Sequence, residues 1–144
     1  MDKWDHRYMH LANVVAEWSK DPSSRIGAVA VSETGQILTT GYNGFPRGIK
    51  DDDRLHDRPV KYKYIVHAEQ NAIYNANYNG VSLKGATMYV AGLPCCSDCA
   101  KGIIQVGIKR VIMDGDPHND RWKESIDLTL SMFDEAGVEW EFME

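Results

Sequence analysis

The spacing of hydrophobic positions changes along the chain, and each change marks a helix or a strand. Apolar side chains recur at helical spacing from about residue 5 to 19, at Leu11, Val14, Val15 and Trp18. Residues 26–31 and 36–42 are then rich in β-branched and aliphatic side chains, with the turn sequence Glu33-Thr34-Gly35 between them. This pattern predicts one helix followed by a β-hairpin.

The rest of the chain predicts helices and strands in alternation. Helices are expected over residues 67–77, 96–106 and 121–136, and strands over residues 86–91, 109–113 and 138–142. The last strand alternates with period two, which is typical of an edge strand with one face toward the core. A strand, a helix and another strand in this order favour a parallel, right-handed crossover.

Residues 43–64 have a different composition. They are rich in Gly, Pro and Asp, show no sustained period, and form a longer segment than an ordinary connector. A loop of this kind is usually functional or partly disordered. Taken together, the elements predict a single α/β domain over residues 1–144, a three-layer α/β/α domain with a five-stranded mixed sheet.

Composition narrows the possible functions. A chain of 144 residues buries enough surface to fold without a disulfide or a metal, so any metal is expected to serve chemistry. A net charge of −5 without a Lys/Arg run argues against a polynucleotide partner, although a small anion held by one or two basic residues remains possible. No apolar leader or membrane-length apolar stretch is present, and cysteines within residues 95–99 favour a reduced, cytoplasmic setting.

The strongest chemical signal is His67-Ala68-Glu69 followed by the sequence PCCSDC at residues 94–99. Cys96 and Cys99 begin a predicted helix three positions apart, so both thiols face one way, and the helix N-terminus favours thiolates. His67 begins the preceding helix and can add a neutral imidazole. Three such ligands leave a fourth position open to water, as in a catalytic zinc site.

Glu69 is the candidate base of this site. Zinc with two thiolates and one imidazole is formally neutral and withdraws little charge from its water, so a neighbouring group must collect the proton.

Two other interpretations of the His67–Cys99 motif are weaker. A structural zinc knuckle needs Cys95 as fourth ligand, in a strained chelate with Cys96, and a core helix with buried cysteines leaves the His-x-Glu sequence without a role.

These motifs give the chain a family resemblance. The His-x-Glu and Pro-Cys-x-x-Cys signature is that of zinc-dependent nucleobase deaminases. From about Trp4 to Phe142 the chain resembles the cytidine deaminase superfamily, and within it the deoxycytidylate (dCMP) deaminases of phages or bacteria. Four stretches carry the resemblance: SKDPSSRIGA (19–28), GYNGFPRG (41–48), HAEQNAI (67–73) and CSDCAKGIIQVGI (96–108). One departure is Cys95, which stands where members often have proline.

The resemblance implies a reaction and a set of site residues. Zinc is expected on His67, Cys96 and Cys99. Zinc hydroxide is expected to attack C4 of cytosine while Glu69 protonates N3 and then passes a proton to the departing amine. The products are dUMP and ammonia, which supply the dTTP pathway. The resemblance also implies that Asn43 contacts the sugar and that the Ala68 backbone N–H faces the base carbonyl.

Regulation and assembly are also implied by the resemblance. Relatives are activated by dCTP, inhibited by dTTP, and use Mg²⁺ with the triphosphate effector; they form homo-oligomers, often hexamers. Candidate nucleotide or effector contacts are Arg25, Gly41, Tyr42, Gly44 and Arg47. Each has an ordinary explanation too, since surface arginines are often solvated or paired and glycines at strand ends serve turn geometry. Trp122 could line a pocket or stack on a base, but an aromatic at the start of a helix is more often a core residue, and we expect the core.

Two alternatives remain open, and two others are disfavoured. The enzyme could also use dCTP. Adenosine editing in tRNA fits poorly with the acidic charge, and free-cytidine deaminases usually place cysteine where His67 stands. From a different class comes a non-catalytic, zinc-stabilised nucleotide-binding module, in which Glu69 has no role.

Overall fold

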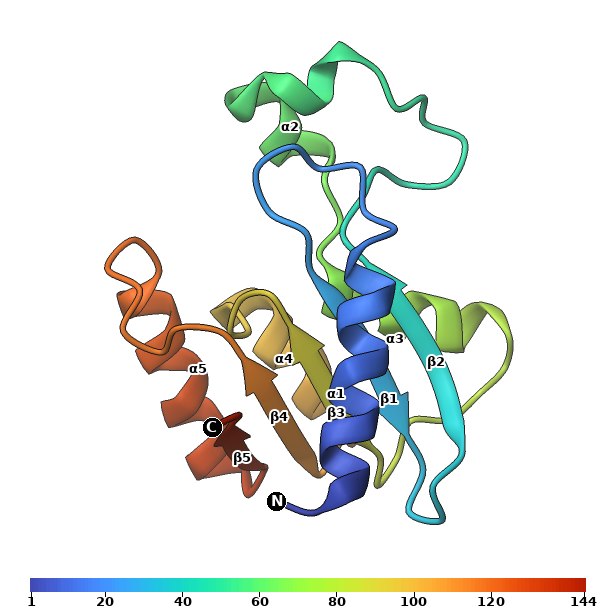
Figure 1. Cartoon of the computed structure of the whole chain (residues 1–144), viewed down its shortest axis with the longest axis vertical. Helices are drawn as coiled ribbons and strands as arrows, with labels where there is room; N and C mark the ends of the chain where they lie inside the picture. Colours follow the sequence, from blue (N-terminus) through green and yellow to red (C-terminus); the bar gives the residue numbers. More distant parts are fainter.

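One mixed sheet organises the computed structural model, which describes residues 1–144 (Figure 1). Its strand order is β2-β1-β3-β4-β5. The strands are β1 (Gly27–Val31), β2 (Ile37–Tyr42), β3 (Thr87–Ala91), β4 (Arg110–Asp114) and β5 (Glu139–Phe142). β1 is antiparallel to β2 and β3, whereas β3, β4 and β5 run parallel. The predicted five-stranded mixed sheet is therefore confirmed, with β5 at an edge.

Helices cover both faces of this sheet. They are α1 (Lys3–Ala16), α2 (Arg58–Tyr64), α3 (Ala68–Tyr78), α4 (Ser97–Gln105) and α5 (Lys123–Ala136). α1 packs through Met9, Ala12 and Val15 on one face, and α3, α4 and α5 share a larger core on the other. Figure 1 shows α1 crossing in front of the sheet. The arrangement is the predicted three-layer α/β/α domain.

Two glycines let helices approach the strand backbone closely. A Cβ at Gly27 would lie 2.1 Å from the carbonyl oxygen of Ala12 in α1. A Cβ at Gly41 would lie 2.3 Å from the backbone nitrogen of Ala72 in α3. Only glycine permits this packing. The contact at Gly41 fixes α3 on the sheet and thereby places the residues at the start of α3.

The segment predicted as a loop is partly helical. It contains a 3₁₀ helix, η1 (Asp53–His56), and α2, which has a proline in its first turn. Both elements are too short to show a hydrophobic period, so the sequence pattern did not reveal them. Paired backbone hydrogen bonds between Gly44 and Val66, of 3.1 and 2.8 Å, close the base of the segment. Residues 45–65 therefore form a fixed insertion beside the sheet.

Element ends differ slightly from the predicted ones. α1 spans residues 3–16 rather than 5–19, because the Asp2 side chain accepts hydrogen bonds from the N–H groups of Trp4 and Asp5 and starts the helix earlier. Gly137 caps α5 in the left-handed conformation, with φ of 79°. No helix has the length and apolar character needed to cross a membrane.

Candidate active site

Three side chains of the kinds that bind metals converge where two helices begin. His67 is the N-cap residue of α3, Cys96 is the N-cap residue of α4, and Cys99 lies in the first turn of α4. The His67 Nδ1 atom lies 3.2 Å from Cys99 Sγ and 3.4 Å from Cys96 Sγ. All three donor atoms lie within 4.8 Å of one another. Donors around a tetrahedral zinc ion are about 3.5 to 3.8 Å apart, so the cluster fits zinc.

The protons of this cluster are strongly coupled. Hydrogen bonds from the Cys99 thiol and from His67 lower the pKa of Cys96 to about 4. The pKa of Cys99 is raised, because it lies beside that thiolate and is buried. The thiolate also raises the pKa of His67. A divalent cation bound here would replace the remaining protons, as thiolate and imidazole ligands require.

Glu69 is the second residue of α3 and borders the cavity next to the cluster. Its side chain is 4% exposed. Burial raises the pKa of its carboxyl group, and the Cys96 thiolate raises it further. Cys95 points to this carboxyl group with its thiol and is not among the clustered metal donors. The geometry therefore brings three potential metal ligands together and keeps the Glu69 carboxyl group separate from them, and it does not support Cys95 as a fourth ligand.

A cavity opens directly above these residues. Its empty volume is about 840 Å³, which includes space open to solvent. Its lining includes His67, Ala68, Glu69 and Cys96. The apolar part of the lining consists of Ile26, Ile65, Leu93, Pro94, Trp122 and Ile126.

Asn43, at the end of β2, is held rigidly in the cavity wall. Its Oδ1 accepts a hydrogen bond of 2.9 Å from the Ile26 N–H. Its Nδ2 donates to the Ser24 carbonyl oxygen at 2.8 Å and to Asp21 Oδ2 at 3.4 Å. Both amide N–H groups are thus occupied, and only a lone pair on Oδ1 remains free. A ligand hydroxyl that meets this side chain must donate.

A buried ion pair ties the insertion to the same wall. Lys61 of α2 places its Nζ atom 3.1 Å from Asp21 Oδ1, and the two side chains are 4% and 5% exposed. The same Asp21 oxygen accepts from the N–H groups of Ser23 and Ser24 at 2.8 and 3.2 Å. Removal of either ionic partner would leave an uncompensated buried charge. α2 is therefore a fixed part of the cavity wall.

The structure brings some predicted site residues together and separates others. His67, Ala68, Glu69, Asn43 and Cys96 border the cavity, with Cys99 beside them in the metal cluster. The residues assigned tentatively to nucleotide or effector contacts lie outside its lining: Arg25, Gly41, Tyr42, Gly44 and Arg47.

Two of these outlying residues have clear contacts of their own. Arg47 donates to the Asn75 side chain and stacks on Tyr78, with its guanidinium 4.8 Å from the ring centre, so it lies along α3. Gly41 serves the close packing of β2 on α3. Any effector contact at these positions would be separate from the cavity. The expectation that Trp122 is a core residue was wrong: it is half-buried and lines the cavity.

Sequence reasoning missed four polar residues of the cavity lining: Arg58, Lys61, Tyr62 and Arg121. The first three lie on α2, which the hydrophobic pattern did not predict. Arg58 and Lys61 are three positions apart, a helical spacing that becomes informative only once α2 is recognised. Arg121 precedes a helix, where the sequence alone gives no sign of a cavity.

Comparisons with known proteins agree with this geometry. Residues 2–114 match the family model for the cytidine and deoxycytidylate deaminase zinc-binding region. The deoxycytidylate deaminase of Homo sapiens is 42% identical over 142 residues, covering 94% of this chain and 77% of the human protein. The deoxycytidylate deaminase of Enterobacteria phage T2 is 31% identical over 176 residues, covering 92% of this chain and 93% of the phage protein.

A solved structure is similar over nearly the whole chain. It is the dCMP deaminase of the cyanophage S-TIM5 in complex with dCMP and dUMP. The two structures superpose with a TM-score of 0.79 and 28% identity, covering 99% of each chain. The structural similarity thus covers almost the whole chain and includes the residues of the metal cluster.

Proposed function

The chain belongs to the cytidine and deoxycytidylate deaminase family, and on this premise we propose that it catalyses the zinc-dependent hydrolysis of dCMP to dUMP and ammonia. One observation carries the proposal: a buried glutamate, Glu69, borders the cavity beside three metal donors. A purely structural zinc site has no use for such a carboxyl group. The similarity to a deaminase structure that contains dCMP and dUMP supports the choice of substrate.

The residues divide the chemistry between them. Zinc held by His67, Cys96 and Cys99 would make a water molecule more acidic and thus more nucleophilic near neutral pH. Glu69 accepts one proton of that water as its oxygen bonds to C4, and delivers it to N3. Glu69 then carries the second proton to the amino group, the C4–N bond breaks, and ammonia leaves. The raised pKa of Glu69 suits a group that both takes and gives protons.

Two further contacts orient the substrate in this proposal. The Ala68 backbone N–H faces the base carbonyl, because Ala68 lies between the metal ligand and Glu69 at the start of α3. The Asn43 Oδ1 atom accepts a hydrogen bond from a sugar hydroxyl, the one function that its other contacts leave free. The apolar cavity walls exclude water from around the base.

A comparison of substrates tests the proposal. Initial rates of ammonia release by the zinc-loaded protein should be highest with dCMP, when dCMP, dCTP and deoxycytidine are supplied separately at equal concentration. Comparable rates with dCTP would favour the enzyme that also deaminates the triphosphate. Release from none of the three would favour the non-catalytic nucleotide-binding module.

Effector control is a separate part of the proposal. By family resemblance, dCTP with Mg²⁺ is an activator and dTTP an inhibitor of a homo-oligomer, hexameric in many relatives. The segment Gly41–Arg47 lies beside α3 and outside the cavity lining, apart from Asn43, which leaves it available for a distinct effector site. An allosteric effector changes the rate by binding at a site distinct from the substrate site.

A titration examines this regulation. At dCMP concentrations below KM, we expect added dCTP with Mg²⁺ to raise the rate and dTTP to lower it, with the dTTP effect reversed by dCTP. Steady-state rates and sedimentation should be recorded on the same samples, because regulation is expected in the oligomer. Flat rates across both titrations would show that this chain lacks the regulatory site.

A further inference from the structure

The loop between β3 and α4, which carries Cys96, is contacted by two hydroxyl groups of α5. The Thr129 side chain donates a hydrogen bond of 2.9 Å to the Cys95 carbonyl oxygen. The Ser125 Oγ atom accepts a hydrogen bond of 2.9 Å from the Ser97 N–H. Cys95 and Ser97 are the two neighbours of Cys96 in the chain. The backbone is therefore held by α5 on both sides of one metal donor.

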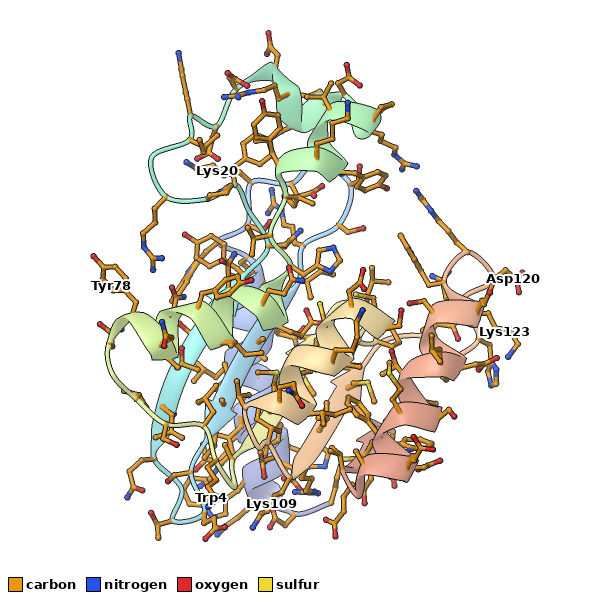
Figure 2. The ribbon with its side chains drawn as sticks, turned by 180° about the vertical axis from the view of Figure 1, so that it is seen from behind. Trp4, Lys20, Tyr78, Lys109, Asp120 and Lys123 are labelled. Atoms are coloured by element: carbon orange, nitrogen blue, oxygen red, sulfur yellow. The ribbon has the colours of Figure 1, made fainter.

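The two hydroxyl groups lie on one face of α5. Ser125 and Thr129 are four positions apart, which is the spacing of neighbours on a helix surface. In Figure 2, α4 and α5 lie side by side on the face of the sheet turned to the viewer, and Lys123 labels the beginning of α5. α5 follows residues 2–114, the part of the chain that matches the family model, so these contacts come from outside the motif that carries the ligands.

The contact from Ser125 satisfies a helix end. Ser97 is the first residue of α4, and the first N–H groups of a helix have no acceptor within the helix. The N-cap side chain often supplies an acceptor oxygen there, but the N-cap residue of α4 is Cys96, which has none. The Ser125 hydroxyl is the hydrogen-bond partner of the Ser97 N–H. α5 thus caps a helix start that is occupied by a metal donor.

The contact from Thr129 satisfies a buried carbonyl group. No backbone N–H donates to the Cys95 carbonyl oxygen, and both Cys95 and Thr129 are fully buried. A buried carbonyl without a donor is costly, because water cannot replace the lost hydrogen bond. The bond therefore restricts the backbone before Cys96 to the conformation in which this carbonyl points to α5.

We propose that Ser125 and Thr129 are positioning residues of the metal site: they fix the backbone before and after Cys96 and so direct its sulfur to the point where His67 and Cys99 converge. The inference rests on the zinc site of the proposed function. Neither hydroxyl group binds the metal or the substrate. Groups that orient a metal ligand in this way typically account for about 10- to 100-fold in metal affinity.

Thr129→Val tests the contact to Cys95, because valine has nearly the shape of threonine but no hydroxyl group. The dissociation constant for Zn²⁺, measured by competition with a chromogenic chelator in the absence of substrate, should rise by about 10- to 100-fold. Thr129→Ser keeps a hydroxyl group and should restore most of the affinity. Ser125 is only half-buried, so Ser125→Ala should fold even where Thr129→Val does not, and it should also weaken Zn²⁺ binding.

Tyr89→Phe is a matched control for the loss of a buried hydroxyl group. The Tyr89 hydroxyl donates a hydrogen bond of 2.6 Å to Asp5 Oδ1, and the ring packs with α1 on the face of the sheet opposite α4 and α5. We expect this variant to have a lower Tm than the parent and yet the parent affinity for Zn²⁺. Ser131→Ala, at an exposed position of α5, should change neither quantity.

Substitution of Co²⁺ for zinc gives a second readout, which a loss of stability alone does not change. The absorption bands of Co²⁺ bound to thiolates depend on the ligand geometry. At saturating Co²⁺, the spectrum of Thr129→Val should differ from that of the parent, and the spectrum of Tyr89→Phe should not. The parent affinity or the parent spectrum in Thr129→Val, or an equal loss of affinity in Tyr89→Phe, would overturn the assignment.

These measurements also separate the inference from the proposed function. Zinc affinity and Co²⁺ spectra are recorded without dCMP, so they report on the metal site alone. A parent protein that binds zinc and releases no ammonia from dCMP would refute the proposed function. A parent protein that is active while Thr129→Val and Ser125→Ala keep the parent affinity for Zn²⁺ would refute only the positioning role.

Discussion

Replacing Glu69 with glutamine should leave the zinc content unchanged and lower kcat for dCMP by about 10²- to 10⁴-fold, the range expected for loss of general acid–base catalysis. The amide has nearly the size of the carboxyl group but carries no transferable proton at neutral pH. Because Glu69 is buried and is not one of the clustered metal donors, the substitution separates proton transfer from metal binding. Zinc analysis and single-turnover rates, measured on one preparation, provide the test.

The matched control is Glu135→Gln, a substitution on the exposed surface of α5. It should retain the parent rate and the parent zinc content. KM for dCMP in Glu69→Gln should change much less than kcat, since the carboxyl group acts on protons that move during the reaction. Near-normal turnover in Glu69→Gln would refute the assigned proton transfer.

Replacing Cys99 with serine should remove both zinc and activity. Serine is nearly isosteric, but its hydroxyl stays protonated where the cysteine supplies a thiolate, so one of three ligands is lost. We expect the bound zinc to fall from one ion per chain to a small fraction of that after dialysis against a weak chelator. Turnover of dCMP should fall below detection, and added zinc should not restore it.

Cys95→Ala provides a demanding comparison, because Cys95 is the adjacent buried cysteine of the same loop. It is absent from the donor cluster, so this variant should keep one zinc ion per chain under the same dialysis. Retention of full zinc by Cys99→Ser, or its loss from Cys95→Ala, would contradict the ligand assignment. The two variants together distinguish a three-ligand site from a structural knuckle that includes Cys95.

The sequence predicted best what depends on short, regular spacing. Strand residues alternate between two cores, with Ala28 and Ala30 on one face of β1 and Val29 and Val31 on the other. The metal donors could also be predicted from the sequence, because the start of a helix places Cys96 and Cys99 on one side. In both cases the geometry of one element was sufficient.

The insertion illustrates what spacing does not reveal. α2 has seven residues and no apolar period, and its position is set by the buried pair between Lys61 and Asp21. The sequence alone does not indicate that Lys61 pairs with Asp21, 40 positions away. The same limitation affected Trp122, since a large aromatic near a helix start fits a core and a cavity wall equally well. Contacts between distant segments therefore decided the form of the cavity.

The net charge of the whole chain also differs in sign from the charge of several residues that line the cavity. The net charge of −5 argued against a polynucleotide partner, yet the cavity lining includes Arg58 and Arg121, neither of which forms an ion pair within 4.0 Å. A local pair of guanidinium groups attracts one phosphate without creating a broad basic surface. This combination suits a small nucleotide.

The central claim is hydrolysis at C4 of dCMP, and isotope transfer from water tests it most directly. The zinc-loaded protein should be incubated with dCMP in H₂¹⁸O, and the nucleotide product and ammonia quantified by mass spectrometry. The account predicts dUMP that carries one ¹⁸O atom, formed together with an equal amount of ammonia. Absence of dUMP, or dUMP without the label at a time when solvent exchange is negligible, would contradict it.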